Sequence, residues 1–301
     1  MKKKLIATLL SAAMCLSLAA CGQKTDAPAG SGSGSGAVSA SNGEKTQYTV
    51  GICQLVQHVA LDAATQGFID ALNEALPGQV TIENKNASGE ANNCATIVNG
   101  FVSEGVDLIM ANATGALTAA ASATADIPIL GTSITAYGVA LDIDNFSGTV
   151  GGNISGTSDL ADLSKQADMI LEWFPETQKV GLLFCSAEPN SKYQIDEVAK
   201  HLADKGIETK EFAFTDTNDV ASVTQAAADY SDVVYIPTDN TAASNTEAIA
   251  NVLVPAGVPA ICGEEGICSG CGVATLSISY YDLGVTTGKM AAKILTGEAD
   301  I

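Results

Sequence analysis

The chain contains no arginine, and this absence restricts what it can bind. A guanidinium group is the side chain that binds carboxylates and phosphates through two parallel hydrogen bonds. The 14 basic residues are therefore all lysines, against 34 Asp and Glu, and the net charge is −20. We expect no nucleic-acid binding, because that needs clustered cations. A ligand carboxylate must be held by backbone N–H groups, hydroxyls, amides or a lysine.

Histidines and the short motifs of common enzymes are scarce or absent as well. The two histidines, His58 and His201, are far apart in sequence, which argues against a hydrolytic zinc site. The chain lacks the glycine-rich motifs of dinucleotide and nucleotide binding, G-x-G-x-x-G and G-x-x-x-x-G-K-[ST]. It also lacks the nucleophile motif G-x-S-x-G. We therefore expect no enzyme activity, no metal and no cofactor.

The first twenty residues have the pattern of a signal peptide. Residues 1–4 (MKKK) are basic, residues 5–18 are apolar apart from Ser and Thr, and residues 18–21 are LAAC. The apolar stretch is shorter than the ~20 residues of a membrane helix, and no later stretch approaches that length. We predict a signal peptide over 1–20, cleaved before Cys21, with a lipid attached to Cys21 as in bacterial lipoproteins. The alternative is a plain secretory signal.

A flexible tether is predicted after the anchor, over residues 21–46, because it contains the repeat GSGSGSG at 30–36. Cleavage leaves 14 − 3 = 11 lysines, so the charge becomes 11 − 34 = −23. Such an acidic body is not expected to bind anionic lipid by itself, so the anchor must hold it at the membrane.

The six cysteines after the anchor leave three alternatives open. Cys262, Cys268 and Cys271 lie close together, which permits unpaired structural thiols, a local disulfide, or metal or redox chemistry. A second matched pair of ligands is missing, so unpaired thiols are favoured. Cys53, Cys94 and Cys185 lie in apolar segments and are expected to be core residues.

Short apolar runs alternate with amphipathic segments from residue 48 onward, as in parallel sheets with helices on both faces. The expected strands are 48–54, 80–84, 108–111, 128–131, 179–185, 208–214, 233–237, 259–262 and 273–277. The expected helices are 61–76, 92–104, 117–123, 160–174, 194–205, 220–230, 243–253 and 282–295. A passage with no clear period, rich in glycine at 148–156, separates two such runs. We predict an α/β protein with two doubly wound parallel-sheet lobes joined by a hinge, 47–157 with 278–301 and 158–277.

Polar side chains follow the predicted strands, where ligands of open parallel sheets collect. Hydroxyls, amides and carboxylates occur at 54–58, 112–115, 132–135, 186–191, 238–240 and 263–265. Hydroxyls and helix N-termini suit a carboxylate, and Asp or Glu suits an ammonium, so the set predicts a zwitterionic ligand. The same residue types also cap helices, and a lone His58 on a loop is also expected to be solvated. Asp239 is the expected ammonium partner unless it is a helix cap, in which case Glu264 takes that role.

Five segments resemble one family in order and spacing: 51–58 (GICQLVQH), 128–135 (PILGTSIT), 151–159 (GGNISGTSD), 237–240 (PTDN) and 280–284 (YYDLG). Over residues 48–299 the chain resembles the bacterial ABC-transporter substrate-binding lipoproteins that take up tryptophan or tyrosine. The resemblance implies a type I periplasmic-binding-protein fold that closes on its ligand. It also implies ligand contacts from Gln54, His58, Thr114, Ser133, Thr135, Asn190, Ser191, Asp239, Asn240 and Glu264. The family often has Asp at the position of Ala136, and usually continues some thirty residues past Ala299.

The resulting hypothesis is a monomeric, lipid-anchored protein on the extracytoplasmic face of the membrane. It would bind a small amino acid, preferably an aromatic one such as tryptophan or tyrosine, and deliver it to the permease subunits of an ABC importer. Another small solute, a ligand sensor for a membrane receptor kinase, and an enzyme on the same two-lobed scaffold are the alternatives.

Overall fold

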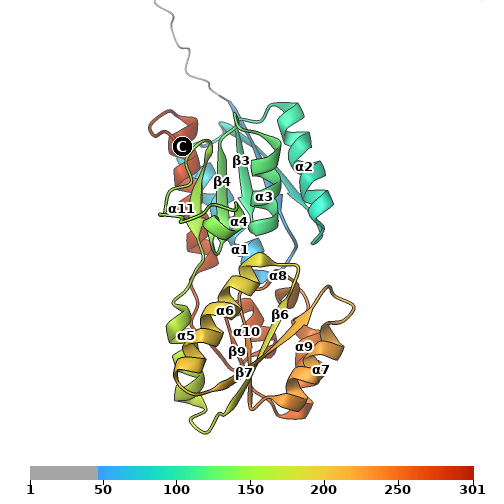
Figure 1. The fold of residues 1–301 in the computed structure, drawn as a ribbon. Coiled ribbons are helices and arrows are strands. Elements are labelled where there is room, and N and C mark those ends of the chain that lie inside the picture. The colour runs from blue at the N-terminus through green and yellow to red at the C-terminus, as the bar shows by residue number, and fades with distance from the viewer. Residues whose placement is uncertain (1–46) are drawn as a thin grey trace, which may run out of the picture. The chain divides into compact units, whose positions relative to one another are not determined.

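Two parallel β-sheets of five strands each organise the computed structural model, which describes residues 47–301 (Figure 1). The first sheet has the order β2-β1-β3-β4-β5 and consists of Tyr48–Gln54 (β1), Val80–Asn86 (β2), Leu108–Asn112 (β3), Ile129–Ile134 (β4) and Ile154–Ser158 (β5). The second has the order β10-β9-β8-β6-β7 and consists of Lys179–Cys185 (β6), Glu208–Phe214 (β7), Val233–Ile236 (β8), Ala260–Cys262 (β9) and Ala274–Thr275 (β10). This confirms the predicted fold class.

Helices flank both sheets. Those packed with the first sheet are Val59–Ala75 (α1), Ala91–Glu104 (α2), Thr114–Ala123 (α3), Tyr137–Ala140 (α4) and Tyr280–Leu295 (α11). Those packed with the second sheet are Leu163–Trp173 (α5), Pro189–Asp204 (α6), Val220–Tyr230 (α7), Asn240–Ala243 (α8), Thr246–Ala256 (α9) and Glu265–Cys271 (α10). We call these two groups, each with its sheet, the first lobe and the second lobe. Within 47–301, no helix combines the length and the apolar character needed to cross a membrane.

The central strands β1, β3 and β4 of the first sheet are buried on both faces, which explains their apolar runs. Val50 and Ile52 of β1 pack in one cluster with Phe68 of α1. Cys53, on the opposite face of the same strand, packs in another cluster with Phe101 of α2. Successive side chains of a strand point to opposite faces, so one strand serves both cores.

Helix α11 follows the last strand of the second lobe yet packs against α1 of the first lobe. The approach depends on glycine, because a Cβ at Gly284 would overlap the backbone carbonyl of Ala64. A Cβ at Gly67 would likewise overlap the carbonyl of Tyr281. The chain therefore connects the lobes twice, between β5 and α5 and between β10 and α11.

Three regions differ from the predicted elements. The passage at 137–158, predicted without regular structure, contains α4 and the edge strand β5, whose partly exposed sequence ISGTS carries no apolar run. The helix predicted at 243–253 is two helices, α8 and α9. The short helix α10 was not predicted, and it begins at the cap Glu264.

Candidate functional site

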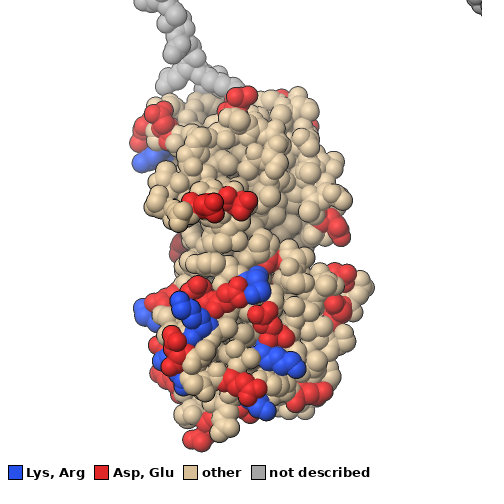
Figure 2. Space-filling model, in the orientation of Figure 1, with Lys and Arg blue, Asp and Glu red and all other residues tan. Residues whose placement is uncertain are grey.

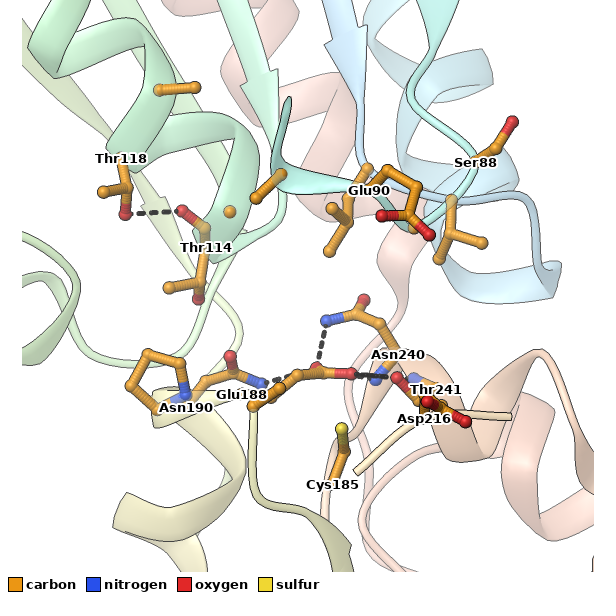
Figure 3. Close-up of a pocket in the computed structure, with 18 of the residues that line it drawn as sticks. Ser88, Glu90, Thr114, Thr118, Cys185, Glu188, Asn190, Asp216, Asn240 and Thr241 are labelled. Atoms are coloured by element: carbon orange, nitrogen blue, oxygen red, sulfur yellow. Dashed lines mark hydrogen bonds between the residues drawn. The ribbon is translucent and has the colours of Figure 1, made fainter. Parts of the chain in front are cut away.

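A narrow cavity of about 10 Å3, enough for about one water molecule, lies where strands of both sheets end. It is lined by His58, Leu61, Ser133, Thr135, Asp159, Asn190, Thr238, Asp239, Asn240, Ala243, Glu264 and Tyr280. A groove of about 770 Å3 opens beside it and is lined by residues of both lobes (Figure 3). Asn190 and Asn240 line both spaces and so mark the side of the cavity that faces the groove.

Asp159 and Tyr280 come from the two segments that connect the lobes. The Tyr280 hydroxyl donates to Asp159 Oδ2 at 2.8 Å, and both side chains are buried. Asp159 Oδ1 is buried without a hydrogen-bond partner. Burial raises the pKa of Asp159 above its ordinary value, against the opposing effect of the hydroxyls of Tyr280 and Thr135. The unpaired oxygen is an acceptor that a ligand can use.

Ser133 is held in an unusual backbone conformation near the end of β4. Its φ is +56°, in the left-handed region that non-glycine residues rarely adopt, and the pairing of β4 with β5 is irregular between Gly131 and Ile134. The Ser133 Oγ atom is buried without a partner. Strained conformations of this kind concentrate at ligand sites, where the surrounding fold maintains them.

His58, the residue before α1, contacts the second lobe. Its Nε2 lies 3.2 Å from Asn240 Oδ1, while its Nδ1 is enclosed and has no partner. Burial lowers the pKa of His58, which keeps the imidazole neutral near pH 7. The predicted solvated position of His58 is therefore not what the structure shows.

Asp239 and Glu264 are buried helix caps at the edge of the cavity. Asp239 Oδ1 accepts from the backbone N–H of Ala242, and Oδ2 accepts from that of Cys185, both at 2.7 Å. Glu264 accepts from the N–H groups of Gly266 and Ile267. Burial raises the pKa of Asp239 to about 7 and also raises that of Glu264. Backbone donors occupy both carboxylates, so Asp159 is better placed than either to pair with a ligand.

Glu188, which follows β6, is a central residue that the sequence analysis did not select. Its carboxylate accepts from the side chains of Asn190, Asn240 and Thr241 and from the backbone N–H groups of Asn240 and Thr241 (Figure 3). All five partners are donors. No sequence motif indicated this convergence, because it joins loops fifty residues apart.

The structure brings seven of the ten expected contact residues to the cavity wall: His58, Ser133, Thr135, Asn190, Asp239, Asn240 and Glu264. Three lie elsewhere. Gln54 is buried beneath α1, where its amide donates to Asp62 and accepts from Thr65, and Thr114 lines the groove. Ser191 is buried beside Asn190. Asp159 and Tyr280 were missed as contacts, although each lies in a segment that carries the family resemblance.

Among the described residues, the site has acidic side chains but no lysine. Asp159, Asp239 and Glu264 line the cavity, and within the described residues no lysine lines the cavity or the groove. On the face shown in Figure 2, lysines gather mainly on the second lobe. An acidic cavity without a cation favours a ligand with a positively charged group.

The six cysteines within 47–301 form no disulfide. Cys185 lines the groove, whereas Cys262 of β9 hydrogen-bonds with Cys268 and Cys271 of α10. The described part of the chain holds no group of three or more His, Cys, Asp or Glu side chains that could bind a metal ion.

Comparison with known proteins identifies the family. Residues 49–300 match the model of the ABC transporter substrate-binding proteins. The chain belongs to this family. A tyrosine-binding protein of Clostridioides difficile (strain R20291) is 32% identical over 261 residues, which cover 85% of this chain and 74% of that protein. The predicted ABC substrate-binding protein is thus confirmed, and the family is one of binding proteins rather than enzymes.

Two solved structures are similar to this substrate-binding protein. An ABC domain in complex with L-Trp from Streptococcus pneumoniae is 31% identical, with a TM-score of 0.80 over 83% of this chain and 85% of that one. A ligand-free, open substrate-binding protein with adhesive properties from Clostridium difficile is 32% identical, with a TM-score of 0.61 over 84% and 86%. At nearly equal identity, the structure as a whole is more similar to the ligand complex than to the open protein.

Proposed function

We propose that this substrate-binding protein binds a zwitterionic aromatic L-amino acid, such as tryptophan or tyrosine, in the cavity between its lobes. One observation carries the proposal. Six buried side-chain polar atoms in the described residues lack a hydrogen-bond partner, and three of them line this cavity: His58 Nδ1, Ser133 Oγ and Asp159 Oδ1. Buried polar groups are normally paired, so three unpaired atoms around one space indicate a missing partner. The tyrosine- and tryptophan-binding relatives support the ligand class.

Each end of a zwitterion has a partner in this cavity. Asp159 offers its unpaired carboxylate oxygen to an ammonium group. The Ser133 hydroxyl, which has no partner, offers a donor to a carboxylate in place of the arginine that the chain lacks. The amino-acid side chain would extend past Asn190 and Asn240 toward the groove.

Entry of such a ligand requires the lobes to separate. A cavity of about 10 Å3 has room for about one water molecule, so it must widen both to admit and to hold an amino acid, whereas the groove beside it is about 770 Å3. We propose that 47–157 with 278–301 and 158–277 move as two bodies about the two connections, in the manner of hinge closure.

Native mass spectrometry of the purified protein tests the proposal most directly. We expect a co-purified mass equal to that of an aromatic amino acid, lost on denaturation and restored by adding L-tryptophan or L-tyrosine. Selective retention of a sugar or another solute without an α-amino acid group would contradict the proposed ligand.

The affinity for the ligand should fall as the pH is lowered, because protonation of Asp159 removes the charge that pairs with the ligand. A ligand ammonium pairs with the ionised carboxylate, and burial raises the pKa of that carboxyl above its ordinary value. Binding is therefore strongest above this pKa and weakens as the pH falls through it. We expect calorimetry with L-tryptophan to show weaker binding at pH 5 than at pH 7.5.

The variant Asp159→Asn supplies the control for this pH dependence. Its remaining affinity should vary less between the two pH values, because the Asn side chain does not titrate. Equal affinity of the unmodified protein at pH 5 and pH 7.5 would contradict the role given to Asp159.

We further propose that the protein is anchored through Cys21 and hands its ligand to permease subunits of an ABC importer. Residues 1–46, which hold the signal peptide, the anchor and the tether, lie outside the described residues. The support is the sequence: a basic start, a short apolar stretch and LAAC before a glycine- and serine-rich segment.

Cys21→Ser should release the protein from the membrane or leave it uncleaved. Metabolic labelling with a fatty acid and membrane fractionation measure the change, and Cys53→Ser, a buried cysteine of the first sheet, is the matched control. Unchanged labelling and membrane association of the Cys21 variant would rule out this attachment site.

A further inference from the structure

The orientation of the Asn240 amide is determined by Glu188. Asn240 Nδ2 lies 2.7 Å from Glu188 Oε2, and a carboxylate oxygen surrounded by donors acts only as an acceptor. The reverse amide orientation would place Asn240 Oδ1 against the carboxylate and is therefore unfavourable. The backbone N–H of Asn240 donates to the same oxygen at 3.0 Å and holds the two residues together.

The orientation of Asn240 in turn determines which nitrogen of His58 carries the proton. Asn240 Oδ1 is the atom 3.2 Å from His58 Nε2, and a carbonyl oxygen can only accept. His58 Nε2–H must therefore donate to Asn240, which leaves Nδ1 as an unprotonated acceptor in the neutral ring. This Nδ1 is buried, has no partner and belongs to a residue that lines the cavity.

We propose that His58 Nδ1 accepts a hydrogen bond from the ligand side chain, and that Glu188 positions His58 for this role through Asn240. The inference rests on the proposed function. Asp159 takes the ammonium at the connection between the lobes, whereas His58 contacts Asn240, which faces the groove. The preferred ligand is then an aromatic amino acid whose ring bears an O–H or N–H group. Phenylalanine would leave Nδ1 unpaired.

The proton on His58 can be located in the closed protein, where His58 contacts Asn240. The chain has two histidines, so nitrogen NMR of the 15N-histidine-labelled protein saturated with L-tyrosine resolves both imidazoles. His201, which pairs with Asp168 on the surface, serves as the internal reference. We expect His58 to be neutral with its proton on Nε2. A proton on Nδ1, or on both nitrogens, at pH 7 would overturn the proposal.

Two variants test the positioning role of Glu188. Glu188→Ala removes the acceptor that orients Asn240, while Asp239 still caps α8. Asn240→Ala removes only the amide and keeps the backbone contact with Glu188. Both should shift the His58 nitrogen resonances toward the tautomer mixture of a free imidazole. Glu247→Gln, an exposed charge change in the same lobe, should leave them unchanged. Unaltered resonances in both variants would show that Glu188 does not position His58.

Calorimetry with L-tyrosine and L-phenylalanine tests the ligand contact. Because phenylalanine would leave the buried Nδ1 unpaired, its binding should be weaker than that of tyrosine by about 5- to 150-fold. In His58→Ala this preference should disappear. Equal binding of the two amino acids by the unmodified protein overturns the inference and leaves the proposed function intact. Binding of neither L-tyrosine, L-phenylalanine nor L-tryptophan overturns both.

Discussion

Asp159→Asn should weaken binding of L-tryptophan or L-tyrosine by about 30- to 4,000-fold, equivalent to 2–5 kcal/mol. The substitution keeps the shape of the side chain and an oxygen for the Tyr280 hydroxyl, which lies 2.8 Å from Asp159 Oδ2. It removes the charge, and with it the unpaired carboxylate oxygen that faces the cavity. An ammonium group taken out of water without an anionic partner is costly, so the loss should be large. Isothermal calorimetry on ligand-stripped protein measures it.

Two other Asp-to-Asn changes separate this role from a general effect of charge. Asp126→Asn alters an exposed residue and should leave affinity unchanged. Asp239→Asn alters a cap whose two oxygens accept from the backbone N–H groups of Ala242 and Cys185, so it should affect stability more than affinity. If Asp239→Asn abolished binding while Asp159→Asn bound normally, the ammonium partner would be Asp239, and our assignment would be wrong.

The central strands were predictable because burial on both faces leaves an apolar run in each of them. Strands β1, β6 and β7 were predicted to the residue. The edge strand β5 was missed because an edge strand need not be apolar on both faces. Its Gly156 also has a φ of +144°, which is not the backbone conformation of a regular strand. Short α8 and α10 were missed because their capping residues, Asp239 and Glu264, also fit a ligand-binding role. A helix of one or two turns is too short to produce a recognisable hydrophobic period in the sequence.

Seven of the ten expected contact residues line one cavity, because parallel strands end at the same edge of a sheet. That they contact a ligand stays a prediction. Which carboxylate is free depends on backbone N–H groups contributed by distant loops, and sequence spacing does not contain that information. Asp239 accepts from Cys185, 54 residues away, and Asp159 accepts from Tyr280, 121 residues away. The unpaired oxygen of Asp159 could therefore be found only in the folded chain.

Gly284→Ala should destabilise the protein by about 1–3 kcal/mol, the usual cost of inserting a methyl group into a tightly packed interface. Gly284 lies where α11 crosses α1, and a Cβ there would overlap the carbonyl group of Ala64. That obstacle is backbone, so it cannot rotate away as a flexible side chain could. The two helices would have to separate along a contact that also includes Gly288, where a Cβ would lie 2.6 Å from the Phe68 carbonyl oxygen. The higher helix propensity of alanine offsets only part of this cost.

Gly100→Ala is the matched control, and its expected effect has the opposite sign. Gly100 lies inside α2, and a Cβ at that position would meet nothing within 4 Å. Alanine should therefore stabilise the protein by about 0.5–1 kcal/mol through the lower entropy of its unfolded chain and its better helix propensity. Urea unfolding followed by circular dichroism gives both midpoints on the same scale. If Gly284→Ala raised the midpoint as Gly100→Ala does, the close α1–α11 contact would not exist in solution, and α11 would not hold Tyr280 against Asp159 as described.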